Sequence, residues 1–309
     1  MNIVQTSKEL IKELHNPGHL YMRAMHHYPK LFRWLDDEDY LKFSYKITMG
    51  KKLNLSDPRT FSEKLQWLKL NNRENLYTTI VDKYAVKQYI ANQIGTEYII
   101  PTLGVWDSFE EIEFDKLPNQ FVLKCTHDSG GLVVCKDKTT LNVEWARKKI
   151  NRSLENDFYL VGREWPYKNV PHRIIAEQYM ADDLRDYKLF CFNGVPRMTL
   201  VCSERFTKDG LKEDFYDEAW NHLDVQRPNH GNAILPIERP KQYELMKELA
   251  AKLSEKMPFA RIDFYEINEK VYFGEITFYP ASGFEGFKPE EWDLKLGEWI
   301  KLPNGGGIG

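Results

Sequence analysis

One stretch of the chain combines a lysine with a small, polar turn between two apolar runs. Residues 120–135 read QFVLKCTHDSGGLVVC, with Lys124 near the end of the first run. The turn then offers His127, Ser129, Gly130 and Gly131. Backbone amides exposed by small residues, together with a lysine charge, suit the covering of a polyphosphate. The GxxxxGK[ST] spacing of a P-loop is absent, and a plain hairpin turn explains the two glycines at least as well.

A second stretch places two carboxylates on neighbouring strand-like runs. Residues 260–284 read ARIDFYEINEKVYFGEITFYPASGF, with Asp263 before the turn and Glu275 after it. In an antiparallel hairpin these acids can share one face and hold divalent cations between them. Thr277 lies two residues beyond Glu275, so it shares that face and can add an oxygen. The alternative is a buried acid that is satisfied by Arg261 or by hydroxyl groups.

Two weaker patterns stand beside these. Glu177, Gln178, Tyr179 and Met180 end one strand-like run, and Asp186 and Lys188 begin the next. A strand, a short charged connector and a second strand fit a hinge where backbone groups and an acid meet a purine and its ribose, but they fit a surface hairpin equally well. Lys83 lies within VDKYAVKQY, which reads as a helix, and a helical lysine by itself is normally solvated.

Composition bounds the kind of protein that carries these motifs. The 309 residues include 43 basic and 46 acidic side chains, for a formal net charge of −3, so no global field favours nucleic acid or an anionic membrane. We find no apolar stretch near the roughly 18 residues that span a bilayer and no secretory signal pattern, so we expect a cytoplasmic protein. The four cysteines stand singly, without a CxxC pair, which favours reduced packing residues.

The elements that must position the motifs change in type along the chain. Up to about residue 95 the pattern is helical, including one helix expected over 76–93 with Asp82 and Lys83 near its middle. Beyond it, short strand-like runs alternate with turns and with helices near 143–154 and 242–256. We therefore predict an α+β fold with a helical region over 1–95, a glycine-loop lobe over 96–180, a second lobe over 181–303 and a flexible tail over 304–309.

Taken together and in this order, the four motifs resemble the ATP-grasp superfamily, in particular its TupA-like branch. The resemblance runs from about residue 56 to 287 and is carried by DKYAVKQYI, FVLKCTHDSGG, RIIAEQYM with DYKLFCFNG, and the acidic hairpin. It implies two α+β lobes that clamp ATP, here preceded by a largely helical N-terminal region. ATP and Mg²⁺ are the cofactors that it implies.

The resemblance also implies a role for each motif residue. Lys83 and Lys124 are similar to the lysines that contact ATP phosphates, and His127 to Gly131, with Ser129 and Gly130, resemble the loop that closes over them. Glu177, Gln178, Tyr179 and Met180 correspond to the adenine and hinge segment, Asp186 to the ribose-binding acid, and Lys188 to a further phosphate contact. Asp263 and Glu275 look like the magnesium-binding acids, with Thr277 as a third ligand. Arg261, Lys124 and Lys188 are the implied catalytic residues.

Two departures limit this transfer. Many ATP-grasp enzymes carry Glu-x-Asn on the metal strand, whereas this chain has Glu275-Ile276-Thr277, and a hydroxyl is a weaker ligand than an amide carbonyl. The helical N-terminal third also replaces the Rossmann-like substrate lobe of many members, so the acceptor site does not follow by analogy.

The activity implied is that of an ADP-forming carboxylate-amine ligase of bacterial surface-polysaccharide or capsule biosynthesis. It would join an amino acid or amine to a uronic acid or other carboxylate, in association with polysaccharide assembly enzymes. Two other classes stay open: a glycosyltransferase in which Asp263 and Glu275 hold a metal diphosphate, and a non-catalytic nucleotide-binding scaffold. ADP formation separates the ligase from the transferase, and turnover separates both from the scaffold.

Overall fold

The computed structural model describes residues 20–21, 28–181, 185–203, 210–234 and 236–303. The first residues of the helical region expected over 1–95 and the tail expected over 304–309 lie outside the described residues. Within the described ranges no helix combines the length and the apolar character that crossing a bilayer requires.

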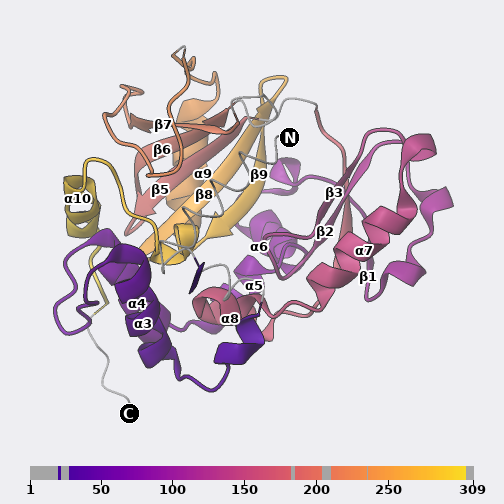
Figure 1. Ribbon diagram of the computed structural model, residues 1–309. Coiled ribbons are helices and arrows are strands. Elements are labelled where there is room, and N and C mark those ends of the chain that lie inside the picture. Colours follow the sequence, from indigo (N-terminus) through magenta and orange to yellow (C-terminus); the bar gives the residue numbers. More distant parts are fainter. Residues whose placement is uncertain (1–19, 22–27, 182–184, 204–209, 235, 304–309) are drawn as a thin grey trace, which may run out of the picture.

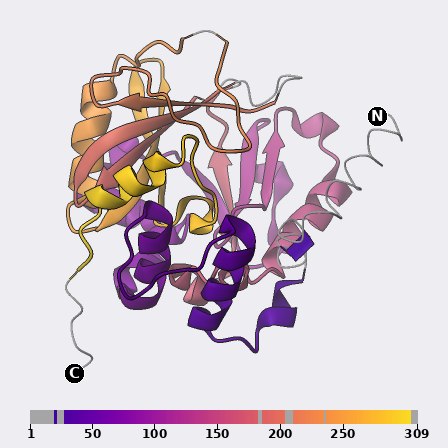
Figure 2. The same ribbon diagram turned by 60° about the vertical axis from the view of Figure 1, so that its left-hand side comes forward.

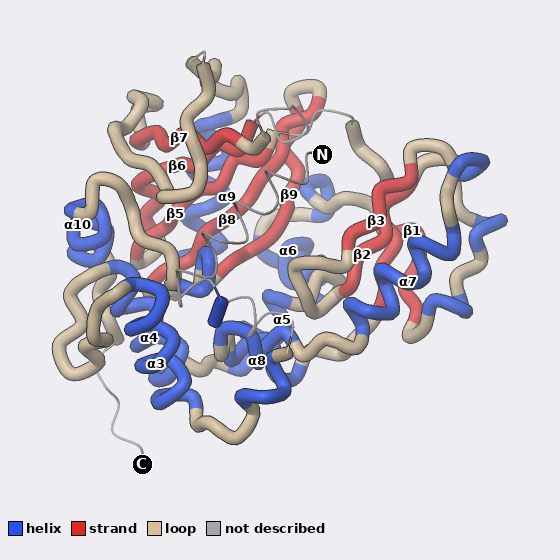
Figure 3. The backbone as a smooth tube through the Cα atoms, viewed as in Figure 1, coloured by secondary structure: helices blue, strands red, loops and turns tan. Residues whose placement is uncertain are grey.

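Two antiparallel sheets form the frame of the molecule (Figures 1 and 3). The smaller sheet has the order β1-β4-β2-β3, from β1 (Thr102–Trp106), β2 (Phe121–Cys125), β3 (Leu132–Cys135) and β4 (Ile174–Gln178). The larger has the order β7-β6-β5-β8-β9, from β5 (Asp186–Phe192), β6 (Val195–Ser203), β7 (Lys212–Asp217), β8 (Phe259–Ile267) and β9 (Lys270–Thr277). The α+β architecture predicted from the sequence is confirmed.

The smaller sheet uses its two faces differently. On one face Leu123 and Cys125 alternate into a buried cluster that α7 (Val143–Leu154) covers with Ala146 and Ile150. On the other face lie Lys124 and Glu177, because residues paired across antiparallel strands share a face and Lys124 pairs with Ile175, two positions before Glu177. The alternation therefore delivers both charged side chains to the same side.

The larger sheet shares its core with the helices that precede the first strand. Helix α9 (Tyr243–Ser254) packs against β5, β6 and β8. Buried side chains of α4 (Phe61–Asn71), α5 (Asn75–Val81) and α6 (Ala85–Gln93) belong to the same apolar cluster as that sheet. Helix α3 (Asp37–Met49) packs beside α4 (Figure 2). Residues 61–93 are therefore built onto the larger sheet.

The single helix expected over 76–93 is wrong, because Asp82 interrupts it. The Asp82 carboxylate accepts hydrogen bonds from the backbone N–H groups of Tyr84 (2.8 Å) and Ala85 (3.2 Å) at the start of α6, while its own backbone is extended. A side chain that bonds nearby amides competes with the helix in this way. Arg173 Nη2, at 2.7 Å from Oδ2, holds the acid from the neighbouring segment. The break turns Lys83 out of the helical path.

Strand β7 was not predicted, because its sequence KEDFYD reads as a charged loop. Glu213 is 1% exposed and accepts a hydrogen bond from Arg227 Nε at 2.6 Å. Asp214 is 3% exposed and accepts from the Ala233 backbone N–H at 3.0 Å. Tertiary partners outside the strand thus satisfy both acids, and no local pattern in the sequence reveals them.

Helices α4 and α10 (Glu291–Trp299) complete each other's ends. Asp293 Oδ1 accepts hydrogen bonds at 2.9 Å from both the backbone N–H and the hydroxyl of Ser62, in the first turn of α4. In return Lys64 Nζ donates at 2.8 Å to the carbonyl oxygens of Gly297 and Ile300, at the end of α10. Each helix therefore supplies a charge that suits the other's terminus.

Replacing Lys64 by methionine is expected to lower the free energy of unfolding by about 1–3 kcal/mol, because two C-terminal carbonyls of α10 lose a charged donor. Urea titration measures the change. Lys148→Met, on an exposed face of α7, is the matched control and should stay within about 0.5 kcal/mol of the parent. Equal stability of the two variants would show that the Lys64 contacts contribute nothing.

Candidate functional site

A cavity of about 310 Å³ opens between the two sheets, within the size range of small-molecule sites. Its lining is drawn from both sheets, from α6 and from the turn between β2 and β3. Those side chains and backbone segments are Lys83, Val86, Lys87, Ile99, Ile100, Lys124, Cys125, Asp128, Ser129, Gly130, Gly131, Leu132, Glu177, Asp186, Lys188, Asp263, Tyr265, Phe273, Gly274 and Glu275. Four motifs that are far apart in sequence meet there.

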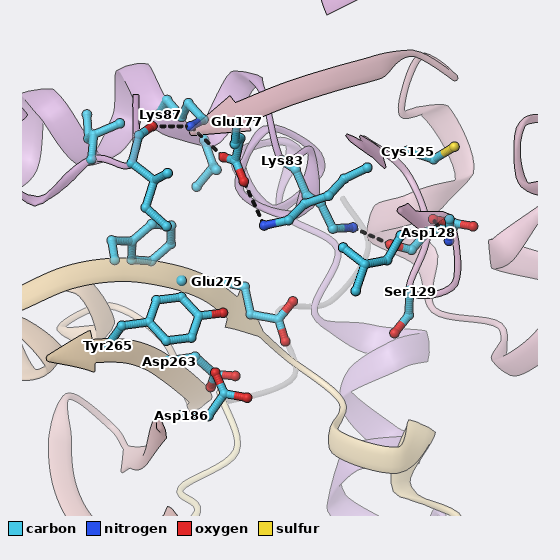
Figure 4. A pocket seen from close by; sticks show the side chains of 18 of the residues that line it. Lys83, Lys87, Cys125, Asp128, Ser129, Glu177, Asp186, Asp263, Tyr265 and Glu275 are labelled. Atoms are coloured by element: carbon cyan, nitrogen blue, oxygen red, sulfur yellow. Dashed lines mark hydrogen bonds and ion pairs between the residues drawn. The ribbon is translucent and has the colours of Figure 1, made fainter. Parts of the chain in front are cut away.

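Three lysines approach the cavity from the side of the smaller sheet (Figure 4). Lys83 follows the break at Asp82, and its backbone N–H donates to the Thr126 carbonyl at 3.1 Å. Its ammonium donates to the carbonyl oxygen of Asp128, so the first lysine is tied to the glycine turn. Lys124 and Lys87 contact the two oxygens of Glu177 at 2.6 and 2.5 Å.

The turn between β2 and β3 is held from behind. Asp128 is buried, and its carboxylate accepts hydrogen bonds from the Gly131 backbone N–H at 3.2 Å and from the Ser153 hydroxyl. Ser129 and Gly130 are exposed at the cavity. A Cβ atom on Gly131 would lie 2.3 Å from Ser153 Oγ and 2.7 Å from Cys125 Sγ, whereas one on Gly130 would meet nothing closer than 3.8 Å. Close packing therefore requires glycine at 131.

Gly131→Ala is expected to lower the free energy of unfolding by about 1–3 kcal/mol, the usual cost of forcing an extra methyl group into a packed site. Thermal or urea unfolding checks it. Gly130→Ala is the matched control, since its methyl group would enter open space, and should change stability by less than about 0.5 kcal/mol. A tolerated alanine at 131 would mean that the turn shifts freely away from Ser153.

Paired acids face the lysines from β8 and β9. Asp263 and Glu275 are register partners on adjacent strands, as the hairpin pattern predicted. Arg261 ties them together: its guanidinium donates to the two oxygens of Asp263 at 2.7 and 2.8 Å and to Glu275 Oε1 at 2.7 Å. Lys188, which pairs with Asp263 across β5 and β8, contacts Asp263 Oδ2 and lies 3.5 Å from Asp186 Oδ2.

The two acids differ in their access to the cavity. Asp263 is 1% exposed, whereas the Glu275 side chain keeps 47% of its surface exposed at the cavity. Partial desolvation inside the cavity would by itself raise the pKa of Glu275, but the positive charges of Arg261, Lys188 and Lys83 outweigh it and lower that pKa to about 2. Glu275 is therefore an ionised carboxylate that is open to the cavity throughout the physiological pH range.

A magnesium ion fits this donor set when it arrives with phosphate. Among the described residues no three His, Cys, Asp or Glu side chains come together as a ready-made metal site. Mg²⁺ is usually held by one or two carboxylates plus substrate phosphates, which matches one open acid beside one buried acid. Glu275 is the accessible ligand, and Asp263 Oδ1 and Oδ2 are already engaged by cationic side chains.

Some predicted site residues lie outside the cavity lining. The His127 ring is 1% exposed, stacks on His172 at 3.7 Å between centroids, and has Nε2 3.2 Å from the carbonyl oxygens of Ser153 and Asn156. Arg261 and Thr277 stand behind Glu275, where Arg261 Nη2 donates to Thr277 Oγ1 at 3.0 Å and that hydroxyl donates to Glu275 Oε1 at 3.2 Å. The last residues of the expected hinge are also outside the lining: Gln178, Tyr179 and Met180.

Two parts of the cavity were missed by sequence reasoning. An apolar portion is formed by Val86, Ile99, Ile100 and Phe273 with the Tyr265 ring, a suitable environment for a flat heterocycle. Lys87 was not assigned to the site, although its spacing of four residues from Lys83 was the available signal. The break at Asp82 and the carbonyl of Ile100, which accepts from Lys87 Nζ at 2.6 Å, are what bring it to the cavity.

The protein has two lobes, each built on an antiparallel sheet with helices, and the cavity between them is lined by lysines, a glycine turn and a pair of acids. This arrangement is that of an ATP-grasp fold. A comparison with family models matches residues 63–301 to the family described as TupA-like ATPgrasp. The chain belongs to this family, as the order of its motifs predicted. A comparison with curated protein sequences gives no match.

Solved structures that resemble this chain do so at low identity. A D-alanine–D-alanine ligase from Bacillus anthracis, complexed with ATP, is 17% identical with a TM-score of 0.39, over 65% of this chain and 55% of that one. A RimK domain ATP-grasp protein from Sphaerobacter thermophilus is 10% identical with a TM-score of 0.42, over 74% and 70%. An L-amino acid ligase from Bacillus licheniformis is 14% identical with a TM-score of 0.40, over 72% and 49%. The chain thus spans about half the length of the first and third.

Proposed function

We propose that this protein is an ATP-dependent, ADP-forming carboxylate-amine ligase. It attaches an amino acid or another amine to a uronic acid or other carboxylate of a bacterial surface polysaccharide. The proposal rests mainly on one observation: a single cavity sets Lys83 and Lys124 opposite the ionised Glu275, with an apolar portion beside them. Membership of the TupA-like ATP-grasp family supports the nucleotide as ATP.

The reaction proceeds in two steps that need no protein nucleophile. A substrate carboxylate oxygen attacks the γ-phosphorus, the bond from that phosphorus to the bridging oxygen breaks, and ADP leaves with the electron pair. The amine nitrogen then attacks the acyl carbon, phosphate departs, and the nitrogen loses a proton. The thiol in the cavity lining fits this scheme, since burial raises the pKa of Cys125 to about 12 and keeps it a poor nucleophile.

The chain's own residues supply binding and charge. Lys83 and Lys124 pair with the phosphates, and Lys188 adds charge near the transferred group. Magnesium, when bound with ATP, neutralises the developing charge of the phosphoryl group. Glu275 would hold the ion beside Asp263, and Arg261 and Thr277 orient Glu275 through their hydrogen bonds to its carboxylate. The turn at Ser129 and Gly130 excludes water from the acyl phosphate, which otherwise hydrolyses.

The remaining assignments extend the same proposal. Asp186 meets the ribose, and Glu177, the residue of the expected hinge that lines the cavity, borders the adenine. The two lobes divide near residue 180. The protein works in the cytoplasm, where ATP is available, alongside polysaccharide assembly enzymes.

The decisive experiment is ATP turnover with Mg²⁺ against a panel of uronic acids paired with amino acids. We expect ADP and phosphate in equal amounts and a new amide, identified by mass spectrometry. Consumption of a nucleotide sugar with no ADP formed from ATP would replace the ligase with a glycosyltransferase. Tight ATP binding with no turnover across the panel would favour a scaffold.

A further inference from the structure

Glu177 is a buried carboxylate shared by two lysines. Its side chain is 8% exposed, at the end of β4 on the cavity face of the smaller sheet. Lys124 Nζ, from β2, lies 2.6 Å from Oε2. Lys87 Nζ, from α6, lies 2.5 Å from Oε1 (Figure 4). Lys87 also donates to the backbone carbonyl of Ile100 at 2.6 Å. Lysines from two separate elements, β2 and α6, therefore converge on one negative charge at the end of β4.

The two lysines are not equivalent. Lys87 keeps 14% of its side chain exposed and already contacts a carboxylate and a carbonyl. Lys124 keeps 26% exposed, on the strand that leads into the glycine turn. Lys87 is thus the more enclosed partner of Glu177, and Lys124 is the partner with more surface open to an incoming ligand.

The net charge of the three side chains depends on Lys87. A pair of Lys124 and Glu177 alone is neutral, whereas the same pair with Lys87 carries one positive charge. At these distances, in a partly buried site, the attraction is only weakly screened. Burial alone would raise the pKa of Glu177, but the charges of Lys124 and Lys87 outweigh it and lower that pKa, so the carboxylate stays ionised.

We propose that Lys87 is a positioning residue that matches the charge of Glu177, so that the Lys124 ammonium stays available to the phosphates of the nucleotide. The inference rests on the proposed function, because it assumes a nucleotide in this cavity. Without Lys87, Glu177 holds Lys124 in a neutral pair and competes with the phosphates for it. Loss of Lys87 should therefore weaken binding of the phosphates and not of the nucleoside.

The test compares binding of ATP and of adenosine, which lacks phosphates, to the full chain without a second substrate. Lys87→Gln removes the charge but keeps a donor for the Ile100 carbonyl, and Lys87→Met removes both. We expect either change to weaken ATP binding about tenfold while adenosine binding changes less than about twofold. Lys87→Arg should restore ATP affinity, and Gln88→Met, at the exposed next position of α6, is the matched control.

A second substitution separates charge matching from a structural role. In the double variant Lys87→Gln with Glu177→Gln the unmatched carboxylate is gone, so we expect ATP affinity to recover above that of Lys87→Gln alone. A double variant no better than the single one, equal losses of ATP and adenosine binding, or unchanged ATP binding would each overturn the inference. A parent chain that binds neither ligand would instead overturn the proposed function, and the inference with it.

Discussion

Replacing Glu275 by glutamine is expected to lower kcat of ADP formation by about 10²- to 10³-fold. The amide keeps the size of the side chain and can still bond Thr277, but it removes an open, ionised carboxylate that lines the same cavity as the lysines. The affinity for Mg²⁺ should fall by about 10- to 100-fold. Turnover measured across a Mg²⁺ titration separates the two effects.

Glu248→Gln, an exposed position of α9, provides the matched control for this loss. It should leave kcat and the Mg²⁺ dependence unchanged. If Glu275→Gln keeps kcat within threefold of the parent at saturating Mg²⁺, Glu275 is not a metal-binding acid of the reaction. Asp263 would then have to act alone, although its oxygens are both engaged by cations.

Arg261→Met is expected to lower the free energy of unfolding by about 3–5 kcal/mol, the usual cost of removing one partner from a buried ion pair. Asp263 is 1% exposed and accepts two hydrogen bonds from this guanidinium, so the variant leaves a buried carboxylate with Lys188 as its remaining cationic contact. The pKa of Asp263 is raised by its burial, and the loss of Arg261 raises it further. Protonation removes the negative charge that has lost Arg261 as its partner. The difference between variant and parent in the free energy of unfolding should therefore shrink as the pH falls.

Urea unfolding at neutral pH and at about pH 5 measures both effects. Arg152→Met, exposed in the last turn of α7, is the control and should change stability by less than about 0.5 kcal/mol. The stability of Arg261→Lys should lie between those of the parent and of Arg261→Met. An ammonium keeps the charge but cannot bond Asp263 through two parallel donors as the guanidinium does. Full stability of Arg261→Met with lost turnover would assign Arg261 to the chemistry alone.

The hairpin of β8 and β9, which carries Asp263 and Glu275, was predictable because the sequence features that indicate it lie close together in the chain. Strand-like alternation on both sides of the turn EINEK placed Asp263 and Glu275 on one face, and the register pair has that form. The break at Asp82 was not predictable, because the helical pattern of 76–93 continues through it. Only Arg173 and the amides at the start of α6 reveal why the chain turns there.

The same distinction applies to the cavity. Lys124 and Glu177 sit on strands whose alternation fixes the face that they share, so their approach could be expected from the motifs. Lys87 acquires its place only through the carbonyl of Ile100 and through Glu177, which lie 13 and 90 positions further along the chain. His127 shows the reverse, since this residue of the turn finds its partners in the carbonyl groups of Ser153, in the last turn of α7, and of Asn156, just beyond it.

The reciprocal contacts between the ends of α4 and α10 also affect how the chain folds during its own synthesis. The backbone N–H of Ser62, in the first turn of α4, has Asp293 as its hydrogen-bond acceptor. The apolar side chains of α4 are buried in a core that includes Leu296 and Ile300. A chain emerging from the ribosome therefore carries Phe61 and Leu65 with part of their final cover missing until residue 300 has been made. Contacts of such sequence separation slow folding and prolong the exposure of apolar surface. Nascent chains stalled before residue 290 should accordingly remain chaperone substrates.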